Sequence, residues 1–529
     1  MSLQFIIGSS GSGKSCYAYQ NIIEQAGLHP EKLFFVIVPE QFTMQTQKTL
    51  VEMSPGKGIL NIDILSFERL AYRVLEEVGG DSRTLLEETG KSMVLQKMVQ
   101  QHGKELSYLG GQMRKAGYLD EVKSILSEFM QYDIRDSEIQ EMIEDSSDRA
   151  LLQMKLKDVS VLYQAFIGYL KDHYMTGEEV MDALEKALPF SKKMKNSVLL
   201  LDGYTGFTPI QMRVVGELLA VCEKVMVTVT MDATENLSTR GKPYQLFYMS
   251  RQMIHGLSEL TRDIEESILL KDVRKSRFSQ APALHFLEKN IFRYRKNVYK
   301  KKQDEICMFS ATSPLKEMEE TARRIARLVR EKDCRYGEIA VITGNLEEYG
   351  NLAKQVFAAA GIPYFIDEKH TVLMNPFVEY FRAALEMAVQ DFSYESVFRY
   401  LRCGMSCVTR EEADLLENYV LALGIRGFKK WDEVWVRIYR GMPPENIQRL
   451  NEIRERFADE TRELALSFKG GKKTVREYCT ILYEFALKSQ VQQKLKHQEL
   501  KFKEQGDKAM EKEYAQIYGL SLIHISEPT

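Results

Sequence analysis

The P-loop near the start of the chain is the feature that most constrains its fold. Residues 8–15 read Gly8-Ser9-Ser10-Gly11-Ser12-Gly13-Lys14-Ser15 and fill every position of the motif. The apolar residues 3–7 before it predict a short buried strand, and residues 15–25 predict the helix that follows. Glycines in such a loop let backbone N–H groups surround a phosphate, and the helix N-terminus adds partial positive charge. We expect Lys14 to reach the β- and γ-phosphates of a nucleotide and Ser15 to hold Mg²⁺.

Composition indicates a globular chain of several domains. Its 529 residues exceed what one core supports, so roughly two to four domains are expected. A net charge of −3 indicates no global attraction to nucleic acid, although it is compatible with a local basic track. The seven cysteines include no C-x-x-C pair, which favours reduced thiols. Because we find neither a signal sequence nor an apolar run of ~18 residues, we predict a cytoplasmic protein without membrane contact.

Strand and helix patterns alternate at first and are then interrupted. Apolar runs at 33–38 and 59–65 predict two further strands, each followed by a helix, which is typical of a parallel α/β core. From about residue 84 to 188 only amphipathic helical patterns remain, and strands return at 197–202 and 224–232. We therefore expect one α/β domain with an all-helical insertion.

A second α/β unit is expected further along the chain. It begins near residues 306–310 and continues through a charged helix at 314–332, a strand at 339–343 and the segment 361–365. From about residue 375 the pattern is helical. The predicted fold class is therefore α/β, with parallel sheets interrupted by all-helical insertions.

A P-loop also needs a carboxylate that organises the metal, and two strands end in one. Asp202 follows the apolar run 198–201 and is the natural candidate, with Asp232 as the alternative. In motor ATPases a Glu that polarises the attacking water comes next, but here the next residue is Gly203. Losing a general base costs ~10²–10⁴ in rate, so we expect nucleotide binding with poor hydrolysis unless another carboxylate, such as Glu40, supplies the base.

A basic and aromatic run lies between the two α/β units. Residues 292–302 read Phe-Arg-Tyr-Arg-Lys-Asn-Val-Tyr-Lys-Lys-Lys, a composition suited to neutralising phosphates and stacking on bases. The alternative is a solvated charged linker. The candidate DNA contacts are Arg293, Tyr294, Arg295 and Lys296.

These motifs, in this order, resemble the AddB subunits of bacterial AddAB helicase–nucleases, relatives of the UvrD/RecB-like superfamily 1 helicases. The resemblance spans about residues 1 to 400. It is carried by the P-loop, by Val-Pro-Glu-Gln-Phe-Thr at 38–43, by Ile-Leu-Ser-Phe-Glu-Arg-Leu-Ala at 64–71, by Leu-Asp-Gly-Tyr-Thr-Gly-Phe-Thr-Pro-Ile-Gln at 201–211 and by the stretch 339–364.

The resemblance implies a domain plan of RecA-like units. A RecA-like 1A domain would be split by a helical 1B domain and followed by a 2A domain interrupted by 2B. The expected domains are 1–80 (1A, first part, with the P-loop), 81–192 (1B-like insertion), 193–302 (1A, second part, and linker), 303–390 (2A, first part), 391–520 (2B-like) and 521–529 (a tail resembling adapter read-through).

The resemblance also implies a function. AddB proteins bind ATP with Mg²⁺ but are not thought to be the translocating motor. They pair with an AddA-like motor and nuclease subunit, act on single- and double-stranded DNA ends in recombinational repair, and help to recognise Chi sequences. Family members are about twice as long, so a truncated chain is suspected, and the nuclease and its 4Fe–4S cluster are expected only in the missing C-terminal region.

Other functions fit parts of the sequence. An active DNA-dependent ATPase motor would share the whole pattern. A P-loop kinase of a small metabolite would share the first 75 or so residues. A nucleotide-gated scaffold without DNA contact would leave the basic run as a linker.

Overall fold

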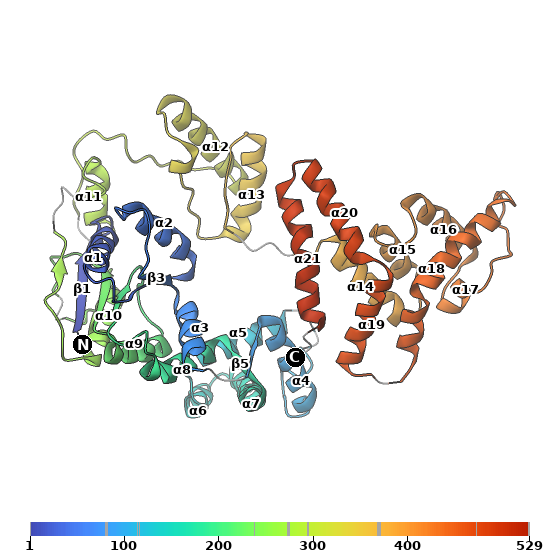
Figure 1. Cartoon of the computed structure of the whole chain (residues 1–529), viewed down its shortest axis with the longest axis horizontal. Helices are drawn as coiled ribbons and strands as arrows, with labels where there is room; N and C mark the ends of the chain where they lie inside the picture. The colour runs from blue at the N-terminus through green and yellow to red at the C-terminus, as the bar shows by residue number, and fades with distance from the viewer. Residues whose placement is uncertain are drawn as a thin grey trace. The chain divides into compact units, whose positions relative to one another are not determined.

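The computed structural model describes residues 2–79, 83–113, 115, 117–236, 239–271, 276–293, 296–367, 372–471 and 473–526. The chain divides into two compact units, Met1–Phe309 and Ser310–Thr529 (Figure 1). Each unit is described by itself below. The finer domain boundaries expected from the sequence stay predictions.

The first unit is built on a six-stranded, all-parallel sheet. The strand order is β3-β2-β6-β7-β1-β8. The strands are β1 (Ser2–Gly8), β2 (Phe34–Ile37), β3 (Ile62–Leu65), β6 (Val198–Leu201), β7 (Lys224–Thr230) and β8 (Ile268–Leu269). The first five confirm the strands predicted from apolar runs. The two-residue β8 was missed because so short a strand leaves no periodic signal.

Helices cover both faces of this sheet, which is why its strands are apolar on both sides. All four residues of β2 and of β6 are buried. One face packs against α1 (Lys14–Leu28) and α2 (Thr43–Met53). The other packs against α3 (Phe67–Val78), α8 (Gly177–Ala187), α9 (Pro209–Val221) and α10 (Tyr248–Leu260). The remaining described helical elements of the sheet region are η1 (Glu40–Phe42), η2 (Leu188–Phe190) and α11 (Pro282–Asn290).

The insertion between β3 and β6 is largely helical, as predicted, but not wholly so. It comprises α4 (Glu88–His102), α5 (Tyr118–Gln131), α6 (Asp136–Asp145) and α7 (Ala150–His173). Helices α4, α5 and α7 share a core of their own, and α6 packs against α7. Where the chain enters and leaves this core, β4 (Thr84–Leu86) pairs in parallel with β5 (Tyr174–Thr176). These three-residue strands pair their backbone groups with each other. They are too short to show the apolar–polar alternation from which strands are predicted, so the sequence did not indicate them.

The second unit differs from the predicted α/β unit. Helices α12 (Pro314–Glu331) and α13 (Leu346–Ala359), with η4 (Tyr336–Glu338), form a small core, and no strand occurs among its described residues. The predicted second parallel sheet is therefore wrong for this part of the chain. The segments expected to form this sheet, residues 306–310, 339–343 and 361–365, are not strands and have no neighbouring strand among the described residues of this unit. Ile339 and Ile362 pack against the two helices, whereas Ile342 is 93% exposed and Phe365 86% exposed.

The rest of the second unit is a helical bundle, as predicted from about residue 375. It comprises α14 (Pro376–Val389), α15 (Tyr394–Arg402), α16 (Arg410–Leu423), α17 (Phe428–Asp432), α18 (Asn446–Lys469), α19 (Val475–Lys488), α20 (Val491–Glu504) and α21 (Lys508–Ser526). Buried aromatic side chains, among them Tyr380, Tyr400 and Trp431, dominate its core. The expected tail begins within α21, and residues 527–529 lie outside the described part of the chain.

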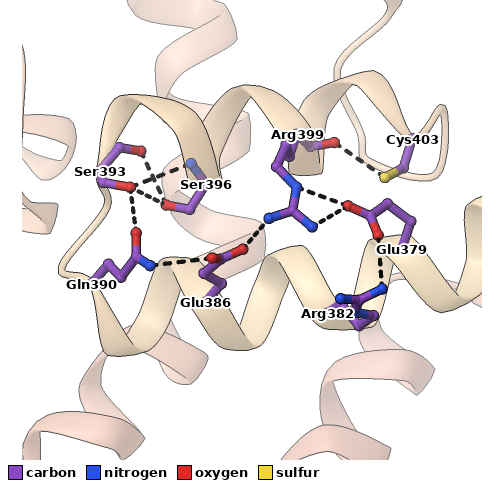
Figure 2. Close-up of polar contacts among 8 residues, drawn as sticks. All are labelled: Glu379, Arg382, Glu386, Gln390, Ser393, Ser396, Arg399 and Cys403. Carbon is purple, nitrogen blue, oxygen red and sulfur yellow. Dashed lines mark hydrogen bonds and ion pairs between the residues drawn. The ribbon is translucent and has the colours of Figure 1, made fainter. Parts of the chain in front are cut away.

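Charged contacts tie α14 to α15 on the bundle surface. Figure 2 shows the Arg399 guanidinium between Glu379 and Glu386, which lie on α14. Its Nε donates to Glu379 Oε1 at 2.8 Å, and the Cys403 thiol donates to the Arg399 carbonyl at 3.1 Å. These groups are partly exposed, so each contact contributes little to the stability of the fold.

The described helices do not meet the requirements for a membrane-spanning helix. None of them combines the length and the apolar composition needed to cross a bilayer.

A buried carboxylate caps an irregular segment of the insertion and gives a stability prediction. Asp158 on α7 is 2% exposed and accepts the backbone N–H groups of Ser107, Tyr108 and Leu109 at 2.9, 2.7 and 2.7 Å. Asp158→Ala should lower the free energy of unfolding of the insertion by about 2–3 kcal/mol, because buried donors lose their acceptor. Urea unfolding followed by circular dichroism measures this, with the exposed Asp145→Ala as the control. Equal stability of the two variants would contradict the capping role.

Candidate nucleotide-binding site

The P-loop turns between β1 and α1, and two glycines make that turn possible. Gly11 and Gly13 have φ angles of 74° and 89°, a region that other residues enter at a cost. A Cβ at Gly11 would also lie 2.9 Å from the Phe278 ring. Gly13 is the N-cap of α1, so the loop runs directly into the helix N-terminus, where free backbone N–H groups can bind an anion.

Lys14 lies at the start of α1 and reaches back across the loop. Its Nζ donates to the Ser9 carbonyl at 3.0 Å. Burial lowers the pKa of Lys14, while the negative charges of Asp202 and Glu288 oppose that shift. A partly buried ammonium in this loop suits a phosphate, since hydrogen bonds between an ammonium and phosphate oxygens are charge-assisted and strong.

Ser15 and Asp202 are in contact although 187 positions, including the whole insertion, separate them in the sequence. Ser15 Oγ donates to Asp202 Oδ1 at 3.0 Å, and Asp202 is only 5% exposed. The contact arises because β6 ends at the same sheet edge as β1, with β7 between them. Of the two predicted metal-site carboxylates, Asp202 is therefore the one placed beside the P-loop hydroxyl.

Two further hydroxyls bind this carboxylate, and the sequence reasoning missed both. Tyr19 OH donates to Asp202 Oδ2 at 2.6 Å, and Thr228 Oγ1 donates to Oδ1 at 2.5 Å. Burial, followed by the charge of Asp202, raises the pKa of Tyr19 above its ordinary value. The i+4 spacing from Ser15 to Tyr19 was an available signal, because it puts both side chains on one helix face.

The residue after Asp202 is Gly203, and its backbone conformation disfavours the catalytic glutamate that motor ATPases carry there. Gly203 has a φ of 83°, so any other residue there would strain the backbone. Glu40, the predicted substitute base, follows β2, which is the neighbour of β6 in the sheet. Its Oε1 lies 2.8 Å from Arg69 Nη2, and its side chain is 53% exposed. Glu40 thus reaches the same sheet edge while being held by an ion pair.

Asp232, the alternative carboxylate, belongs to a different cluster. Its Oδ2 accepts from Arg293 Nη1 at 3.0 Å, and its Oδ1 accepts from Thr234. Burial would raise the pKa of Asp232, but the hydrogen bonds from Thr234 and the charge of Arg293 outweigh it and lower that pKa. Glu288 also lies 3.4 Å from Arg293. The cluster borders a hollow of about 80 Å³ beside the P-loop serines.

Of the four predicted DNA contacts, the structure describes two, Arg293 and Lys296, and these two differ in exposure. The Arg293 side chain is 8% exposed, packs over the Phe247 ring at 5.2 Å and belongs to the ion-pair cluster of Asp232. Lys296 is exposed. Tyr294 and Arg295 lie outside the described residues.

The residues present fit a magnesium nucleotide. Ser12 Oγ is buried and has no hydrogen-bond partner within the described structure, so it offers a hydroxyl to a ligand oxygen. Mg²⁺ on nucleotides is typically held by one or two protein oxygens together with phosphates, which matches Ser15 and Asp202. Across the described ranges, no group of three or more His, Cys, Asp or Glu side chains could hold a metal.

Comparisons with known proteins point in one direction. The family model described as "ADDB, N-terminal" matches residues 5–288. A protein of Lachnoclostridium phytofermentans, described as one subunit of an ATP-dependent helicase/deoxyribonuclease, is 41% identical over 99% of this chain and 46% of its own length. Proteins with the same description from Clostridium novyi and Caldanaerobacter subterraneus are 33% identical over 98% of this chain, and 45% and 46% of their own lengths. The chain therefore spans about half the length of the curated relatives it matches.

The P-loop geometry gives a binding prediction. Lys14→Ala should weaken the affinity for a fluorescent nucleoside triphosphate by about 1.5–3 kcal/mol, the contribution of a hydrogen bond to a charged group. Fluorescence titration measures this, and Lys48→Ala on α2, whose side chain is 76% exposed, is the control. Equal affinity of both variants and the wild type would rule out Lys14 as a phosphate ligand.

Proposed function

This chain belongs to the AddB family of helicase–nuclease subunits, and from that premise we propose that it is the ATP-binding, helicase-like part of such a protein. It would bind ATP with Mg²⁺, turn it over slowly by itself, and act on DNA ends within a larger complex. Membership of this family argues against the small-metabolite kinase considered from the sequence.

The nucleotide would be held by groups already described. Backbone N–H groups of residues 8–15 and the Lys14 ammonium would bind its β- and γ-phosphates. Ser15 and Asp202 would hold Mg²⁺, which shields phosphate charge when bound. The buried Ser12 hydroxyl would donate to a phosphate oxygen.

The observation that carries slow turnover is Gly203. Its φ of 83° excludes a strain-free glutamate immediately after Asp202, so no carboxylate is placed there to activate water. The second candidate is an active motor that uses Glu40 as base. The position of Glu40 after β2 favours it, and the ion pair with Arg69 opposes it because the carboxylate would have to leave that partner.

The DNA role rests on the names of the relatives and on exposed basic residues. Those relatives are described as subunits of an ATP-dependent helicase/deoxyribonuclease. Lys296, Lys300 and Lys301 are exposed and suit phosphate contacts. We propose that the chain contacts single- and double-stranded DNA during double-strand-break repair, contributes to Chi-type recognition, and pairs with an AddA-like motor. Nuclease chemistry and a 4Fe–4S cluster would belong to the rest of the protein.

Slow hydrolysis is directly testable. The chain alone should bind ATP yet turn it over below about 0.1 s⁻¹ with or without single-stranded DNA, since a typical enzyme turns over at ~10 s⁻¹ and a missing base lowers the rate at least ~10²-fold. A phosphate-release assay measures the rate, and Glu40→Gln should leave it unchanged. Rapid DNA-stimulated hydrolysis that Glu40→Gln removes would establish the active motor instead.

DNA contact has a separate test in salt dependence. Charge reversal of Lys296, Lys300 and Lys301 to Glu should weaken binding of labelled single-stranded DNA and reduce the slope of log affinity against log salt by about 2, at ~0.7 per lost phosphate contact. The control reverses three other exposed lysines of the first unit, Lys104, Lys171 and Lys186. If both triple variants bind like the wild type, the run is a linker, as the scaffold hypothesis requires.

A further inference from the structure

The Asp202 carboxylate is held by three hydroxyl groups at once. Oδ1 accepts from Ser15 at 3.0 Å and from Thr228 at 2.5 Å, while Oδ2 accepts from Tyr19 at 2.6 Å. A carboxylate offers about four lone-pair sites, so one is left for a further donor. Asp202 and Tyr19 are 5% and 6% exposed, which means that bulk water competes little for these contacts.

Tyr19 is delivered to this carboxylate by the fold rather than by the P-loop motif. It lies one helical turn after Ser15 on α1, on the same face. Its ring packs in the core between α1 and the sheet, with Val36 and Leu200 among the core residues. The hydroxyl therefore emerges from an apolar layer at the sheet edge, where it also lies 3.4 Å from Thr46 Oγ1 on α2.

We infer that Tyr19 is a positioning residue for the magnesium site: it fixes the rotation of the Asp202 carboxylate so that Oδ1 faces Ser15. This inference rests on the proposed function, in which a nucleotide brings Mg²⁺ to Ser15 and Asp202. With Oδ2 anchored by Tyr19 and Oδ1 steadied by Thr228, the carboxylate has one orientation before the metal arrives. Such outer partners of metal ligands typically contribute ~10–100-fold to metal affinity.

The competing interpretation is that Tyr19 only fills the core. Tyr19→Phe separates the two, because it removes one oxygen and keeps the ring. A core filler would tolerate the change at the metal site, whereas a positioning residue would lose metal affinity. The matched control is Tyr17→Phe, because Tyr17 lies on the same helix and is 39% exposed.

In the experiment, metal is first removed from the protein with EDTA. Mg²⁺ is then titrated into a mixture of the protein and fluorescent ATP, and the half-saturating Mg²⁺ concentration is measured. Tyr19→Phe should raise the half-saturating Mg²⁺ concentration about tenfold and leave nucleotide affinity in EDTA unchanged, while Tyr17→Phe should match the wild type. Thr228→Val, which removes the other neighbouring donor, should shift the Mg²⁺ dependence in the same direction. Thermal unfolding of each variant shows whether the fold is kept.

A second comparison asks whether Tyr19 acts through Asp202. In an Asp202→Asn background, Tyr19→Phe should change the Mg²⁺ dependence no further, because the carboxylate it orients is gone. An unchanged Mg²⁺ dependence of Tyr19→Phe alone, or an equal loss in both backgrounds, would overturn the inference. The wild-type titration tests the proposed function separately. If the wild type binds no nucleotide, both the proposed function and this inference are wrong. If the wild type binds nucleotide normally, the variants test the inference alone.

Discussion

The placement of β6 between β2 and β7 is the constraint on which the rest of the first unit depends. β6 is hydrogen-bonded to both neighbours over its full length, and the N–H of Asp202 continues the ladder to the Ile37 carbonyl at 3.0 Å. Because all strands are parallel, their carboxyl ends meet at one edge, and the P-loop and Asp202 come together there. The helical insertion leaves the sheet after β3 and returns at β6 without disturbing this edge.

The chemistry at that edge favours holding a nucleotide over cleaving it. Hydroxyl groups bind and orient the buried carboxylate, and the charge of Lys14 is balanced by Asp202 and Glu288. The backbone at Gly203 turns with positive φ at the point where a motor ATPase would carry its base. Arg293 draws Asp232 and Glu288 together on the other side of the P-loop, so the second carboxylate-ended strand is occupied by an ion-pair cluster.

The second unit shows how strongly strand formation depends on neighbours. Ile339 and Ile362 have the apolar character of buried strands and do pack against α12 and α13. Ile342 and Phe365 face outward and remain exposed. A β ladder needs a second strand, and the described residues of this unit provide none beside these segments. The helical bundle has no such requirement, since each helix satisfies its own backbone and buries one face.

The sequence by itself determined the elements whose signals are local. The P-loop, the apolar runs of β1, β2, β6 and β7, and the amphipathic helices of the insertion and the bundle were all predictable, because turn chemistry and hydrophobic periodicity act within a few residues. The pairing of β4 with β5, the lack of strands among the described residues of the second unit, and the contacts of Tyr19 and Arg293 were not. Only the tertiary structure decided which carboxylate meets Ser15 and which hydroxyls orient it, because strand order follows from burial between segments far apart in the chain.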